Sequence, residues 1–68
     1  MKVQIEVGDT VYVWKSRPGE GEKEATGVIT KIRMANPTRT EVLINGEWWY
    51  LRNDLRNRVQ LIQKGHAI

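Results

Sequence analysis

Cysteine is absent from this chain of 68 residues, and histidine occurs once, at His66. Disulfide bonds, which stabilise many small extracellular domains, are therefore excluded. The usual tetrahedral zinc site is excluded as well, because it is built from several cysteine and histidine ligands. A lone histidine close to the end of the chain also argues against a Ser–His or Cys–His nucleophile pair. The sequence predicts a protein that is not an enzyme and needs no metal or other cofactor.

Long apolar runs are also missing. No stretch approaches the roughly 20 apolar residues that cross a membrane, and Met1 is followed by alternating polar and apolar residues rather than by a secretory leader. We expect a soluble cytoplasmic protein with no membrane partner. The length allows one domain, residues 1–68, with its core in residues 7–62.

The charge is basic overall and unevenly distributed. The formal net charge is +3, but residues 1–24 hold four basic and five acidic side chains, whereas residues 25–68 hold seven basic and three acidic ones. A basic half of a small domain favours an anionic partner such as DNA or RNA. A modest positive charge is also what solubility alone requires.

Residues 40–51 carry the strongest structural signal. Asn45-Gly46 is the preferred pair for a two-residue type I′ turn, because both residues tolerate positive φ. The flanking segments are rich in β-branched, leucine and aromatic residues, which favour strands. In the second arm Trp48 and Tyr50 share one face, while Trp49 shares the other with Leu51. We expect Trp49 in the core and Trp48 at the surface.

Three further strands are predicted around this hairpin. In residues 10–15, Val11 and Val13 point one way and Tyr12 and Trp14 the other. Residues 26–34 form the next strand, in which simple alternation places Ile29, Lys31 and Arg33 together, and residues 58–63 form the last. The Pro-, Gly- and Glu-rich segment 16–25 is expected to be a mobile loop, and residues 64–68 a frayed tail. Asn53-Asp54 marks a single helical turn before the last strand.

Two stretches resemble the opening of a known fold. Val7-Gly8-Asp9-Thr10-Val11-Tyr12-Val13, followed after a charged loop by Gly27-Val28-Ile29-Thr30-Lys31-Ile32, resembles a KOW-type domain. The span 7–62, with its Trp-containing strand before a final short turn, is also similar to the C-terminal DNA-binding domain of retroviral integrases. These resemblances imply an all-β, five-stranded SH3-like small barrel with one 3-10 turn before the last strand, and a binding function.

Aromatic and basic side chains together provide the candidate binding site. Aromatic rings stack on bases, and Lys and Arg pair with phosphates. The predicted nucleic-acid-binding residues are Lys31, Arg33, Arg39, Trp48, Tyr50, Arg52, Arg56 and Arg58.

Two alternatives remain open at this point. In the first, exposed Tyr12, Trp14 and Trp48 line an aromatic groove for a protein or peptide partner, as in domains that bind proline-rich segments. A chain this small also has reason to associate with itself through its edge strands, as a homo-oligomer.

Overall fold

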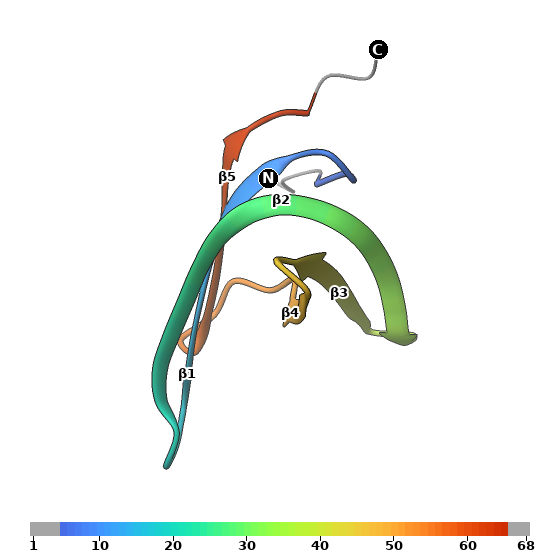
Figure 1. Cartoon of the computed structure of the whole chain (residues 1–68). Helices are drawn as coiled ribbons and strands as arrows, with labels where there is room; N and C mark the ends of the chain where they lie inside the picture. The colour runs from blue at the N-terminus through green and yellow to red at the C-terminus, as the bar shows by residue number, and fades with distance from the viewer. Residues whose placement is uncertain (1–4, 66–68) are drawn as a thin grey trace.

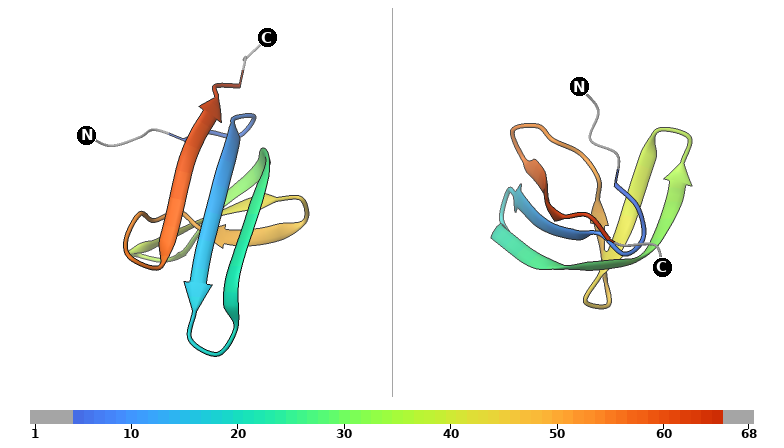
Figure 2. Two further views of the ribbon diagram at one scale, coloured as in Figure 1. Left: turned by 90° about the vertical axis from the view of Figure 1, so that its left-hand side faces the viewer. Right: turned by 90° about the horizontal axis from the view of Figure 1, so that it is seen from above.

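The computed structural model describes residues 5–65, and these form five antiparallel strands without a helix. The strands are β1 (Thr10–Arg17), β2 (Gly21–Asn36), β3 (Arg39–Ile44), β4 (Glu47–Tyr50) and β5 (Asn57–Gln63). Their order in the sheet is β4-β3-β2-β1-β5. The sheet curls into a small barrel-like fold in which β3 and β4 lie across β1 and β5 (Figure 1, Figure 2). The predicted all-β class with five strands is confirmed.

Strand β2 organises the fold because it belongs to both halves of the sheet. Its first half pairs with β1, from Thr10↔Val28 to Arg17↔Gly21, and its second half pairs with β3, from Ile29↔Ile44 to Asn36↔Arg39. Figure 1 shows it as one long arch over the molecule. The pairing with β3 is irregular between Ile29 and Lys31, as in a β-bulge, which adds a residue and bends the strand.

This irregularity corrects the face assignment made from simple alternation. Ile29 is fully buried, whereas Lys31 and Arg33 point outward with their partners on β3. Val28, on the other side of β2, is 47% exposed. A bulge changes the phase of the alternation, so Ile29 belongs to the core and not to the face that carries the two cations.

The core is small and is shared by both halves of the sheet. Its fully enclosed members come from β1, β2, β3 and β4 and are Val11, Val13, Ile29, Val42, Ile44 and Trp49. Ile5, Ala25, Leu51, Val59 and Leu61 pack around them. The predicted alternation of β1 and the burial of Trp49, which is 3% exposed, are both confirmed.

The Asn45-Gly46 turn is formed as predicted. Asn45 has φ of 52° and Gly46 has φ of 78°, which are the signs that a type I′ turn requires. Gly27 lies directly below this turn. A Cβ atom at Gly27 would lie 2.8 Å from Asn45 Oδ1 and from Ile44 Cγ2, so the glycine allows the hairpin to pack closely on β2.

The segment predicted as a mobile loop, residues 16–25, is mainly strand. Strand β1 continues to Arg17 and β2 begins at Gly21, so only Pro18, Gly19 and Glu20 connect them. Gly19 and Gly21 have φ of 81° and 78°, which provides a tight reversal that non-glycine residues rarely make. The Pro-Gly-rich composition therefore marks a hairpin turn and not a loop of ten residues.

The two ends of the described chain are joined at Asp9, which is 1% exposed. Its carboxylate accepts hydrogen bonds from the Glu6 amide at 2.8 Å, the Gly65 amide at 2.7 Å and the Lys64 ammonium at 2.9 Å. The Gly65 bond is the largest of the interactions that hold the pKa of Asp9 at about 2. Of the tail predicted to be frayed, Lys64 and Gly65 are thus held in place, whereas residues 66–68, with His66, lie outside the described residues.

Candidate nucleic-acid interface

The outer side of the β2-β3-β4 half-sheet carries most of the predicted binding residues. In antiparallel pairing, residues opposite one another share a face. Lys31, Leu43 and Trp48 form one row across the three strands, and Arg33, Glu41 and Tyr50 form the next. Six of the eight predicted nucleic-acid-binding residues lie on or beside these rows: Lys31, Arg33, Arg39, Trp48, Tyr50 and Arg52. We call this group the arginine–aromatic face.

Guanidinium groups lie over both outer aromatic rings. Cζ of Arg33 is 3.9 Å from the centre of the Trp48 ring, and Cζ of Arg39 is 4.6 Å from that of Tyr50. Arg52 lies 5.7 Å from the same Tyr50 ring and donates a hydrogen bond to its hydroxyl at 3.3 Å. Cation–π contacts of this kind hold arginine side chains flat on a ring and leave their outer N–H groups available to a ligand.

Glu41 lies underneath the two arginines of β2 and β3. Its Oε1 is 2.9 Å from both Nε and Nη2 of Arg33, and its Oε2 is 3.3 Å from Nε of Arg39. The Glu41 side chain is only 12% exposed, whereas those of Arg33 and Arg39 are 50% and 44% exposed. One carboxylate therefore orients two guanidinium groups. Together, Glu41, Arg33 and Arg39 keep a net positive charge, which the two more exposed arginine side chains present to solvent.

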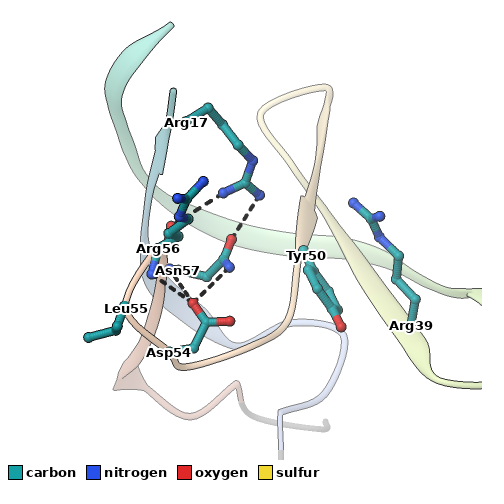
Figure 3. Close-up of a pocket in the computed structure, with 7 residues that line it drawn as sticks. All are labelled: Arg17, Arg39, Tyr50, Asp54, Leu55, Arg56 and Asn57. Atoms are coloured by element: carbon teal, nitrogen blue, oxygen red, sulfur yellow. Dashed lines mark hydrogen bonds between the residues drawn. The ribbon is translucent and has the colours of Figure 1, made fainter. Parts of the chain in front are cut away.

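A pocket continues this face toward the β4–β5 connection. Its volume is about 480 Å³, and it is lined by Arg17, Arg39, Tyr50, Asp54, Leu55, Arg56 and Asn57 (Figure 3). Arg39 and Tyr50 thus belong to both the pocket and the arginine–aromatic face. We call it the β4–β5 pocket.

The wall of the pocket formed by residues 54–57 is a bend organised by Asp54. Asp54 Oδ1 accepts hydrogen bonds from the Arg56 amide at 2.7 Å, the Asn57 amide at 2.9 Å and the Asn57 side chain at 3.0 Å. These hydrogen bonds lower the pKa of Asp54, and the bond from the Arg56 amide has the largest effect. The predicted 3-10 turn is not confirmed, since residues 54–56 form a bend whose backbone is held by a side chain.

Arg17 was not predicted as a site residue. Its Nη1 donates to the Ser16 carbonyl at 3.0 Å and to the Arg56 carbonyl at 3.4 Å, and its Nη2 donates to Asn57 Oδ1 at 3.0 Å. All three acceptors are neutral, and Arg17 has no ion pair within residues 5–65. Composition alone places residue 17 in a mobile loop, so no sequence signal indicates its role here.

Arg56 and Arg58 are separated from one another. Arg56 lines the β4–β5 pocket, whereas Arg58 lies opposite Trp14 on the outer side of the β1–β5 pair. Side chains at alternate positions of a strand usually share a face, but Arg56 precedes β5 and lies in the bend. Arg58 is therefore left out of the candidate interface.

The three aromatic residues of the alternative groove come from strands that are not neighbours in the sheet. Tyr12 and Trp14 lie on β1 and Trp48 on β4, with β2 and β3 between these strands in the sheet. The hollow beside Trp14 is lined by Glu22, Lys23 and Glu24. Tyr12 donates a 2.6 Å hydrogen bond to Glu24, and this bond is the main reason that its pKa is raised. The Trp14 side of the molecule is thus the more acidic one.

Comparison of the chain with protein-family models, curated proteins and solved structures found no match. Within residues 5–65, no His, Cys, Asp and Glu side chains gather in a group of three or more that would hold a metal ion. The same part of the chain has no helix with the length and apolar character needed to cross a membrane.

Proposed function

We propose that this chain is a small, non-enzymatic cytoplasmic module that binds nucleic acid through the arginine–aromatic face. The observation that carries the proposal is the convergence of Lys31, Arg33, Arg39 and Arg52 around the rings of Trp48 and Tyr50. These residues come from three strands and from the segment after β4, and they lie on the same side of the molecule.

The chemistry of this face matches the two parts of a nucleic acid. Guanidinium groups form paired hydrogen bonds with phosphate oxygens, and the positive charge attracts the backbone at long range. Aromatic rings and the planes of arginine side chains stack on bases of any sequence. Stacking of this kind does not distinguish one base from another, so we expect binding with little sequence specificity.

We also assign the fold to the SH3-like barrels, as part of the same proposal. The strand order β4-β3-β2-β1-β5, with a long β2 shared between two half-sheets, supports this assignment. So does the opening that resembles KOW-type domains and the integrase DNA-binding domain, with Gly8-Asp9 before β1 and Gly27 in β2. Since folds of this kind serve many functions, the argument for function depends on the face itself.

The test is a titration of the protein against labelled single-stranded DNA, duplex DNA and RNA, followed by anisotropy at two or more salt concentrations. We expect binding that weakens steeply with salt. In the double variant Arg33→Gln/Arg52→Gln, affinity falls and the slope of log K against log [salt] flattens by about 1.4 for a single strand or about 1.8 for a duplex, the value for two lost phosphate contacts. This pair leaves Arg39 to neutralise Glu41.

The matched control is Arg58→Gln, which removes one cation of the same type from the β1–β5 side. Arg58→Gln should leave the salt slope of the wild type nearly unchanged, whereas the single variant Arg33→Gln should flatten it. If no nucleic acid binds to the wild-type protein at low salt, or if Arg58→Gln and Arg33→Gln weaken binding equally, the proposed interface is wrong.

A further inference from the structure

The β4–β5 pocket contains an arginine whose charge is held in place but not neutralised. The three hydrogen bonds of Arg17 go to two backbone carbonyls and the Asn57 amide oxygen, all of them uncharged. Asn57 is itself buried and held by Asp54. A guanidinium oriented in advance by neutral acceptors loses little conformational freedom when an anion binds to it.

A second cation, Arg56, lies near Arg17 in the pocket (Figure 3). The Arg56 side chain lines the pocket and makes no hydrogen bond or ion pair with any of the described residues. The carboxylate that lines the pocket, Asp54, pairs with Arg52 at 2.7 Å, and the lining residue Arg39 pairs with Glu41. The uncompensated charge of the pocket therefore comes from Arg17 and Arg56.

The opposite wall is aromatic. In Figure 3, Tyr50 stands between Arg39 on one side and the Asp54–Asn57 bend on the other, with Arg56 in the bend and Arg17 above it. Arg39 lies over the Tyr50 ring at 4.6 Å. A planar group that enters the pocket would thus meet an aromatic side chain while its anionic substituent reaches the guanidinium groups of Arg17 and Arg56.

We propose that the β4–β5 pocket accepts one unpaired nucleotide, with its phosphate at Arg17 and Arg56 and its base against Tyr50. This inference rests on the proposed function and makes it more specific. The volume of about 480 Å³ lies within the range of about 300–1,000 Å³ that holds small ligands. A base pair inside a duplex cannot enter such a pocket without leaving the stack, so the protein prefers single-stranded nucleic acid.

The first experiment compares a labelled oligothymidine with a hairpin duplex of the same number of nucleotides, by anisotropy at one salt concentration. We expect the single strand to bind about tenfold more tightly. Arg17→Gln and Arg56→Gln should each reduce that preference by about tenfold, the equivalent of one charged hydrogen bond. Arg58→Gln, with the same loss of charge outside the pocket, should keep it. Arg56→Gln breaks no side-chain hydrogen bond or ion pair within residues 5–65, so we expect it to fold.

The second experiment locates the base. Oligothymidine carrying 5-iodouracil is crosslinked to the wild-type protein by ultraviolet light, and the modified residue is identified by mass spectrometry after digestion. We expect the crosslink at Tyr50. A crosslink at Tyr12 or Trp14, on the β1 side, would overturn the assignment.

The outcomes separate this inference from the proposed function. Equal binding of single strand and duplex, or equal effects of Arg17→Gln and Arg58→Gln, would refute the pocket while the arginine–aromatic face still binds. Absence of binding to either probe at low salt would refute both.

Discussion

Replacing Glu41 with glutamine is expected to strengthen nucleic-acid binding. Glu41 is the carboxylate beneath Arg33 and Arg39, and it accepts from Arg33 at 2.9 Å and pairs with Arg39 at 3.3 Å. A phosphate bound on the outer side of either arginine would be about 8 Å from the carboxylate, since the guanidinium group, about 2 Å wide between its nitrogens, has a hydrogen bond of about 3 Å on each side. Glutamine keeps an oxygen that can orient Arg33 but removes the negative charge.

The size of the gain follows from Coulomb's law. Two charges separated by about 8 Å repel by about 1 kcal/mol at an effective dielectric constant of about 40. Salt screening at physiological ionic strength, where the Debye length is about 8 Å, reduces this to about 0.4 kcal/mol. With one phosphate at each arginine, the repulsion removed is about 0.8 kcal/mol, which corresponds to about fourfold tighter binding.

Anisotropy titrations of wild type and Glu41→Gln at several salt concentrations test this. The dissociation constant should fall about fourfold in Glu41→Gln, while the salt slope stays the same because the number of phosphate contacts does not change. Circular dichroism melting of both proteins serves as the control for folding. Weaker binding by a folded Glu41→Gln protein would refute the reasoning, because it would mean that Glu41 contributes more by orienting the arginines than it costs by its charge.

Two further predictions concern stability. The pKa of Asp9 is lowered from 3.8 to about 2 in the folded protein, so its contribution is fully present above about pH 4 and is lost as the pH falls through 2. The melting temperature of Asp9→Asn should therefore be lower than that of wild type at pH 6, with the difference shrinking toward pH 2; a difference that does not depend on pH would contradict this. Gly27→Ala places a Cβ 2.8 Å from atoms of Asn45 and Ile44 and should cost about 1–3 kcal/mol. In thermal melts the neighbouring exposed control Val28→Ala should cost much less, and equal losses would show that the close packing at Gly27 is unimportant.

Local signals made the hairpin predictable. Asn45 and Gly46 determine their own turn, because both tolerate the positive φ that it requires. Strict alternation along the four residues of β4 places Trp49 on one face and Trp48 and Tyr50 on the other. Arg33, Arg39 and Arg52 could be grouped with these rings because they lie on or next to the same hairpin in sequence. The arginine–aromatic face is therefore largely a consequence of neighbouring strands with regular periodicity.

Features that depend on distant pairing were not predictable in the same way. The irregularity after Ile29 appears only when β2 meets β3, so alternation alone placed Ile29 with Lys31. Arg17 joins the pocket only because β1 lies beside β5, which brings the Arg56 carbonyl within 2.9 Å of the Ser16 amide. The contact between Asp9 and Gly65 links residues 56 positions apart. No residue pattern near these positions indicates such partners.

The sharing of β2 between the two half-sheets has a consequence for cooperativity. Neither half has a core of its own, since Val11 and Val13 of β1 pack with Ile29, Val42, Ile44 and Trp49. Opening one half would leave the apolar side chains of the other in water, so we expect the described chain to unfold as one unit. A ligand that binds to β2, β3 and β4 is therefore expected to slow the hydrogen exchange of buried amides in β1 and β5 as well, although these two strands lie outside the arginine–aromatic face. The reason is that the ligand stabilises the folded state, which protects those amides.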